Sequence, residues 1–223
     1  GDTGGMKTTE KLVDELVAGL EPVSPPPTNN LVTLGWLAVS AACVAMVIHL
    51  AGPVRPGAFT QLHKVPHFTL EMILGAGAAL TLALAAFRSA TPGLLDKRLL
   101  WLALGLITLW VGSIAASLFS PALDTGMLGK RDHCVYETLL YGLPPLVVLL
   151  MWQRRLFVLA PVRSAMLAGL AAGILPALYM QIACMHDASH ILLFHVAPAF
   201  VLAALAPAVA WLLNRRSTAQ DKT

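Results

Sequence analysis

Long apolar runs and short polar breaks alternate along most of the chain. Six of the runs reach the length of about 20 residues that an α-helix needs to cross a bilayer core of about 30 Å. They cover residues 31–51, 68–87, 99–119, 135–152, 162–182 and 191–213. The pattern predicts an all-α polytopic membrane protein, in which residues 31–213 form a bundle of six transmembrane helices. Because the connections are short, we expect this bundle to be the whole fold.

The composition agrees with a protein that lies in the membrane. Hydrophobic residues make up 57% of the 223 residues. Charged residues make up only 12%, against about 25% in a typical soluble domain. No room remains for a separate soluble domain, so a soluble partner must bind the termini or the loops. The chain does not interleave basic with aromatic residues, and we therefore expect no direct binding of nucleic acid.

The residues before the first apolar run form a polar, amphipathic segment. Residues 1–5 precede Met6 and are interpreted as an expression scar. Residues 6–30 contain KTTEKLVDELVAGLE and then the stiff spacer PVSPPP. Thr8 or Thr9 is expected to cap a short helix, whose apolar stripe consists of Leu12, Val13, Leu16, Val17 and Leu20. Such a helix is marginal alone, so the stripe should either bind a partner or lie on the inner leaflet.

The distribution of Lys and Arg predicts the orientation, because cytoplasmic loops carry the excess of positive charge. One side holds eleven of these residues, namely Lys7, Lys11, Arg88, Lys97, Arg98, Arg154, Arg155, Arg163, Arg215, Arg216 and Lys222. The other side holds four, which are Arg55, Lys64, Lys130 and Arg131. Both termini are therefore expected in the cytoplasm, with residues 214–223 as a cytoplasmic tail. No cleavable signal peptide is recognised, so the first span is expected to direct insertion.

Histidine and cysteine collect on the side opposite the termini. With this topology, all seven His and two of the three Cys map to the outer loops and span ends. His49 and His195 are expected about one turn inside the outer face. Cys43 stands apart in the middle of the first span, and we interpret it as a small buried hydrophobe.

The first outer group is HKVPHFTLE, which contains His63, His67 and Glu71. Their i, i+4, i+8 spacing places them along one face of a helix, although Pro66 is tolerated only in a first helical turn. His67 and Glu71 are therefore the safer pair. In the alternative interpretation, both histidines are polar residues at the lipid headgroups.

The second outer group is KRDHCVYETLL, in which His133, Cys134 and Glu137 come together at the start of the fourth span. Glu137 lies about one turn inside the apolar run and needs a partner, because an unpaired carboxylate at membrane depth is costly. The alternative is a helix start with an interfacial carboxylate.

The third outer group is CMHDASH, with Cys184, His186, Asp187 and His190. His186 and His190 are spaced i, i+4, and Asp187 can ligate a metal or orient a His ring. Thiolate, imidazole and carboxylate are the usual ligands of zinc and related ions. A compact bundle brings the three groups together, so we predict one site for zinc or another divalent metal at the outer mouth. The candidate ligands are Cys134, Cys184, His186, His190, His133, His67, His63, Glu137 and Asp187.

Three stretches resemble the NrsF-like family of six-span anti-sigma factors of the bacterial inner membrane. They are TTEKLVDELVAGLEPV before the first span, HCVYETLLYGLPP and CMHDASH. The resemblance implies a protein that holds a cytoplasmic sigma factor of the extracytoplasmic-function (ECF) type inactive and releases it under stress outside the cell. It also implies that Cys134 and Cys184 are candidate sensors. Residues 6–30 would then bind the sigma factor, and residues 31–213 would be the sensor domain.

Other functions fit parts of the pattern less well. In a zinc-dependent intramembrane hydrolase, three His would hold the metal and Glu137 or Asp187 would act as general base. Haem ligation expects His pairs across the membrane, and transport expects charges near the middle of a span. The regulator therefore remains our leading hypothesis. Since the periplasm is oxidising, a disulfide between Cys134 and Cys184 is the alternative state of the metal site.

Overall fold

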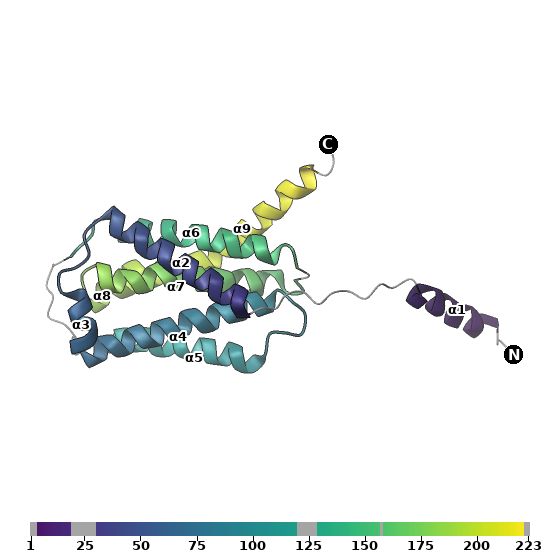
Figure 1. Cartoon of the computed structure of the whole chain (residues 1–223), viewed down its shortest axis with the longest axis horizontal. Coiled ribbons are helices and arrows are strands. Elements are labelled where there is room, and N and C mark those ends of the chain that lie inside the picture. Colours follow the sequence, from purple (N-terminus) through teal and green to yellow (C-terminus); the bar gives the residue numbers. More distant parts are fainter. Residues whose placement is uncertain (1–3, 19–29, 120–128, 157, 221–223) are drawn as a thin grey trace.

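The computed structural model describes residues 4–18, 30–119, 129–156 and 158–220, and for residues 4–10 and 215–220 the backbone alone. In this part of the chain, all regular secondary structure is helical. The helices are α1 (Gly4–Ala18), α2 (Asn30–Ala51), α3 (Ala58–Lys64), α4 (Pro66–Ser89), α5 (Lys97–Ala116), α6 (Cys134–Gln153), α7 (Pro161–Ala183), α8 (Ala188–Ile191), the π-helical turn η1 (Leu192–Val196) and α9 (Ala197–Gln220). Figure 1 shows α2 and α4 to α9 as one bundle of long helices.

Six helices are long and apolar enough to cross a membrane, which confirms the predicted architecture. They are α2, α4, α5, α6, α7 and a sixth span, Ala188–Asn214, in which α8, η1 and α9 follow one another. The predicted boundaries differ from the observed ones by at most three residues, as at the start of the sixth span (191 against 188). Apolar run length was therefore sufficient to locate every span.

Helix α7 lies at the centre of the bundle (Figure 1), and 72% of its most apolar window is buried. Small residues allow its close contact with α9. A Cβ atom added at Gly169 would lie 2.5 Å from the Cα of Ala203, and one added at Gly173 would lie 2.9 Å from the Cα of Ala199. Close backbone approach between small residues is a common way to pack helices in membranes.

The bundle has two chemically different ends. At the end that we call the terminal end, the first span begins and the sixth span leaves the bundle, and the 90–96 and 154–160 connections lie there (Figure 1). The opposite end, the cysteine end, holds α3, α8 and the start of α6 (Figure 1). Six of the eleven basic residues predicted to be cytoplasmic lie at the terminal end, namely Arg88, Lys97, Arg98, Arg154, Arg155 and Arg163. This separation agrees with the predicted topology, and the orientation in the membrane stays a prediction.

Helix α1 begins at Gly4, earlier than expected. Thr8 and Thr9 therefore lie inside the helix, and the prediction that one of them caps it is wrong. The four described residues of the apolar stripe, Leu12, Val13, Leu16 and Val17, are all at least half exposed. The fifth, Leu20, lies outside the described residues, as does the whole proline-rich spacer PVSPPP.

Candidate functional site

Two cysteines and two histidines converge at the cysteine end. The Sγ atoms of Cys134 and Cys184 are 3.4 Å apart, and the Sγ of Cys184 is 3.4 Å from Nε2 of His190. Together with His195, these residues offer four possible ligand atoms that all lie within 4.8 Å of one another. We call this group the Cys–His site. Both thiols are free, and both are buried.

Three local features bring the four side chains together. Cys134 is the first residue of α6, and Cys184 ends α7 in an extended conformation. The chain then turns, and Asp187 caps α8 by accepting a hydrogen bond of 2.8 Å from the backbone N–H of His190. The start of α6, the end of α7 and the short helix α8 thus place Cys134, Cys184 and His190 at the same end of the bundle.

The π-helical turn η1 explains why His195 belongs to the site. Residues five apart in a regular α-helix point about 140° apart around the axis, whereas the wider turn with i to i+5 hydrogen bonding reduces this angle. The ring centroids of His190 and His195 are accordingly 5.0 Å apart. Pro198 has no N–H for the carbonyl of Phe194, which instead accepts a hydrogen bond of 3.5 Å from Thr138. π-helical turns of this kind occur frequently at functional sites.

The Cys–His site has the chemistry of a tetrahedral metal centre. Around a tetrahedral zinc ion, a thiolate and an imidazole lie about 3.6 Å apart and two thiolates about 3.8 Å apart. The distance of 3.4 Å from Cys184 to His190 is close to the first value, and the two thiols, also 3.4 Å apart, would have to separate slightly to bind the ion. Two thiolates and two imidazoles form a common structural zinc set. The hydrogen bond from the Cys134 thiol, supported by His190 and His195, lowers the pKa of Cys184, which favours the thiolate that binds metals.

His195 is the most unusual member of the site. Its side chain is fully buried, and among the described residues neither ring nitrogen has a partner at hydrogen-bond geometry, although the Cys184 thiol lies close enough to interact with the ring. Leaving a buried polar group unsatisfied costs about 1–3 kcal/mol. An ion bound between the four ligand atoms would satisfy one of these nitrogens. Sequence reasoning placed His195 near the outer face but did not include it among the ligands.

A second polar group at the same end is centred on Glu71, which is fully buried. Its two carboxylate oxygens each lie 3.1 Å from an imidazole nitrogen, one from His67 and the other from His186. Ser117 donates a further hydrogen bond of 3.2 Å to the carboxylate, and the ring of Phe68 packs edge-on against His186. We call these residues the Glu71 cluster.

The structure therefore divides the single predicted site into two. His186 and His190 were expected on one helix face, but α8 begins at Ala188, so His186 lies outside the helix and contacts Glu71. The expected contact between His67 and Glu71 is confirmed. His63 does not share their helix, because α3 ends at Lys64 and Val65 is extended.

The remaining predicted ligands have other positions. His133 is exposed and precedes α6 without a side-chain capping hydrogen bond. Asp187 is exposed, and its hydrogen bonds from Ser189 and from the backbone of His190 lower its pKa. Glu137 pairs with Arg131 at 3.2 Å, which supplies the partner that its depth required. Cys43 is exposed on α2, so the expectation of a buried residue is wrong.

Sequence reasoning counted Arg131 only as a charge, yet it joins two helices. Its guanidinium, which is largely buried, donates to the backbone carbonyls of Ile48, Gly52 and Pro53 at 2.9, 2.8 and 3.1 Å. The end of α2 is thereby attached to the segment that leads into α6. The carbonyl oxygen of Arg131 lies 3.3 Å from the Sγ of Cys134 and is a second possible acceptor for its thiol. The sequence signal that could have identified Arg131 is its position, three residues before Cys134 and six before Glu137.

Arg55 contributes a second buried cation next to the site. Its backbone N–H donates to Ala183 at 2.9 Å, and its guanidinium donates to Gln61 and lies over the ring of Phe68. Burial lowers the pKa of Arg55, while the charge of Cys184 opposes this change. The favourable interaction is mutual, so Arg55 helps to stabilise a Cys184 thiolate.

Comparison with known proteins agrees with the resemblance noted in the sequence. The family model of NrsF, described as negative regulator of sigma F, matches residues 16–215. No curated protein and no solved structure matches the chain. The family match includes both polar clusters and all six spans, but of α1 it includes only the last three residues, 16–18. The chain therefore belongs to the NrsF family of negative regulators of sigma F.

Proposed function

We propose that this protein is an anti-sigma factor of the bacterial inner membrane that holds an ECF-type sigma factor inactive in the cytoplasm. It releases the sigma factor when the Cys–His site, on the periplasmic side, detects metal or oxidative stress. The observation that carries the proposal is the convergence of four ligand atoms within 4.8 Å at the end opposite the termini. Family membership supports the regulation of a sigma factor.

The ligand set favours zinc or another borderline divalent ion. Cysteine and histidine are soft and borderline ligands, and they discriminate against calcium and magnesium. A more thiophilic ion would bind the same thiolates with a different geometry. Exchange of one ion for another would therefore change the distances between α6, α7 and the sixth span, which carry the four ligands.

Oxidation offers a second input at the same residues. The two Sγ atoms are 3.4 Å apart, and a disulfide bond would bring them to about 2.05 Å. Formation of the bond from the Cys134 thiol and the Cys184 thiolate releases one proton and transfers two electrons to an external oxidant, such as a periplasmic disulfide. The disulfide would remove both thiolate ligands, so the metal-bound and oxidised states exclude each other.

Arg131 would transmit a change at the Cys–His site to α2 and, through α2, to the N-terminal segment. Its carbonyl oxygen contacts the Sγ of Cys134 at 3.3 Å, and its guanidinium donates to the carbonyls at the end of α2. Helix α2 follows the N-terminal segment in the chain. A change at Cys134 would therefore shift α2 and alter how α1 is presented.

The apolar stripe of α1 supplies the proposed sigma-binding surface. Leu12 and Leu16 are 57% and 64% exposed, and burial of such side chains against a partner contributes about 1.5–3 kcal/mol each. A helix on the inner leaflet would bury the same stripe in lipid. The two interpretations differ in whether a soluble sigma factor protects the stripe.

The hydrolase alternative is less well supported by the geometry. A catalytic zinc keeps one coordination position open for water, whereas four protein ligands converge here. The two candidate general bases also have other interactions: Glu137 pairs with Arg131, and Asp187 caps α8. The site is therefore better suited to sensing than to hydrolysis, in agreement with a regulatory family.

The test of the sigma-binding segment replaces Leu12, Leu16 and Leu20 with Ser. We expect loss of co-purification with the sigma factor and expression of its target genes without stress. The matched control replaces Lys11, Asp14 and Glu15 with Ser on the same helix and should keep repression. Repression that persists in the leucine variant would assign α1 to the membrane surface and contradict the proposal.

A further inference from the structure

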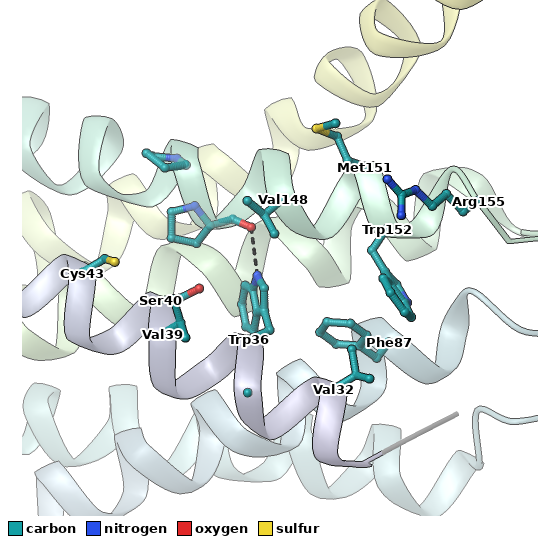
Figure 2. A pocket seen from close by; sticks show the side chains of 13 residues that line it. Val32, Trp36, Val39, Ser40, Cys43, Phe87, Val148, Met151, Trp152 and Arg155 are labelled. Carbon is teal, nitrogen blue, oxygen red and sulfur yellow. Dashed lines mark hydrogen bonds between the residues drawn. The ribbon is translucent and has the colours of Figure 1, made fainter. Parts of the chain in front are cut away.

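An apolar groove lies on the outer surface of the bundle between α2 and α6, far from the Cys–His site. Its volume is about 670 Å³, within the range of about 300–1,000 Å³ typical of ligand sites. Figure 2 shows Trp36 and Val39 of α2 facing Val148 and Trp152 of α6, with Phe87 of α4 beside Trp152. We call this feature the α2–α6 groove.

The walls of the groove offer few polar atoms. The indole N–H of Trp36 donates to the carbonyl of Pro145 at 3.2 Å (Figure 2), so the ring faces the groove with its N–H already satisfied. Pro144 and Pro145 have no N–H to offer. Gly35 leaves space in the wall, since nothing lies within 4 Å of where its Cβ would be. The groove is therefore suited to a hydrocarbon.

Arg155 is the one cation in the lining, and it lies at the terminal end. Among the described residues, its guanidinium makes no hydrogen bond or ion pair, whereas Arg88 at the same end donates to Asn30 at 3.3 Å. The charge count predicts that this end is cytoplasmic. Cytoplasmic leaflets contain anionic lipids that attract Lys and Arg.

The length of the groove matches one leaflet. On α2 the lining extends from Val32 to Cys43, and along α6 and the turn that follows it the lining extends from Pro144 to Arg155. Each stretch rises eleven residues, or about 16 Å at 1.5 Å per residue. This is close to half of a hydrocarbon core of about 30 Å. A packed transmembrane helix would need the full thickness, whereas an acyl chain needs one leaflet.

We propose that the α2–α6 groove binds one acyl chain of an anionic phospholipid, whose phosphate group interacts with Arg155. The lipid fills the space between α2 and α6 and stabilises the position of α2 relative to the bundle. This inference does not depend on the metal site, because the groove shares no residue with the Cys–His site.

The experiment uses tryptophan fluorescence in nanodiscs. Trp101 and Trp211 are exposed elsewhere and are changed to Phe, which leaves Trp36 and Trp152 in the groove and Trp110 buried. The nanodiscs contain phosphatidylcholine with a small fraction of lipid brominated on its acyl chains, either phosphatidylglycerol or phosphatidylcholine. We expect the anionic lipid to quench at a concentration lower by about fivefold, the effect of one Arg near an anionic surface.

Matched variants separate the groove from the general membrane surface. Arg155→Gln should abolish the preference for the anionic lipid, while Arg154→Gln, at the same end but outside the groove, should keep it. Gly35→Leu should fill the groove and reduce quenching. Gly105→Leu, which also has open space around its Cβ, should leave quenching unchanged.

Two results would overturn the proposal. Equal quenching by the two brominated lipids would show that Arg155 selects no phosphate. Oxidation of Cys43 with a membrane-permeable catalyst tests for a second copy of the chain, because Cys43 lines the groove. A covalent dimer through Cys43, formed at the expense of quenching, would assign the groove to that second copy.

Discussion

The Glu71 cluster and the Cys–His site lie at the same end of the bundle but satisfy their polar groups in different ways. In the Glu71 cluster, each carboxylate oxygen has an imidazole nitrogen at 3.1 Å. In the Cys–His site, the equally buried His195 has no hydrogen-bond partner among the described residues. A satisfied buried network makes the surrounding structure rigid, whereas an unsatisfied group is a place for a ligand.

The comparison suggests a division of tasks. The Glu71 cluster joins α4, the end of α5 and the segment before α8, as His67, Ser117 and His186 show. It thereby holds the cysteine end together without any ion. The Cys–His site is formed by α6, the end of α7 and the sixth span, and we propose that it responds to metal and to oxidants.

The largest expected effect is the loss of metal when the thiols are removed. Cys134→Ser combined with Cys184→Ser should reduce bound zinc from about one ion per chain to background, because two of four ligands are lost. Metal analysis and intact mass of the purified protein provide the measurement. The control, Glu71→Gln, should keep the ion. Free thiols without metal in the wild-type protein, or a mass lower by two hydrogens, would instead support an empty or oxidised site.

Removal of the Glu71 carboxylate should mainly affect stability. Glu71→Ala leaves the buried imidazole of His186 and the partly exposed imidazole of His67 without their partner, and breaking a buried pair costs about 3–5 kcal/mol. Thermal unfolding in detergent should show a clearly lowered midpoint, while zinc content stays near that of the wild type. Glu71→Gln, which still accepts a hydrogen bond, should lose less. An unchanged midpoint in Glu71→Ala would remove the structural role of the cluster.

Two histidines provide the sharpest distinction between the clusters. His195→Ala should weaken zinc binding by at least the roughly 10–100-fold that follows when only an outer-shell partner is mutated. His186→Ala should leave zinc affinity within a few-fold, because His186 contacts Glu71 instead. Competition with a coloured chelator measures both affinities. A larger loss in His186→Ala would favour the single site expected from sequence.

The pH dependence of zinc affinity tests the state of the thiols. Because the pKa of Cys184 is lowered, this residue is already a thiolate at neutral pH. Zinc binding then releases one thiol proton, from Cys134, and between about pH 7 and 8 affinity should rise about tenfold per pH unit. Glu71→Gln should show the same slope. A hundredfold rise per unit would mean that both thiols carry protons before zinc binds.

The smallest expected effect concerns transmission from the site to α2. Arg131→Gln removes the charge and shortens the side chain, so it loses the ion pair of Nη1 with Glu137 and the hydrogen bonds of Nη2 to the carbonyls at the end of α2. Coupling between separated sites typically changes by about 0.5–2 kcal/mol in such variants. We expect a several-fold change in reporter expression with zinc content unchanged. Lys130→Gln, its exposed neighbour, is the matched control.

Sequence reasoning located the spans well and the site in part. Apolar run length determined all six spans, because a helix in lipid must satisfy its own backbone over the full thickness. The pairing of Cys134 with Cys184 followed from assigning both to one end. Sequence reasoning could not foresee that His195 belongs to the Cys–His site in place of His186, because the i, i+4 argument assumed a continuous helix. Here Asp187 starts a new helix at Ala188, and a π turn follows.

The amino-acid sequence by itself determined that the chain is a six-span bundle with an amphipathic N-terminal helix and that its thiols and imidazoles gather at one end. These features depend on composition and local spacing. The thickness of the bilayer sets the length of each span, and the distribution of basic residues predicts the side on which each loop lies. Tertiary structure alone decided which polar groups meet. Glu71 and His186 are 115 residues apart, and Arg131 binds a carbonyl 83 residues earlier. Such contacts depend on how the helices pack and on the direction in which each turn points the residues that follow it. The π-helical turn η1, which contains His195, is the local example.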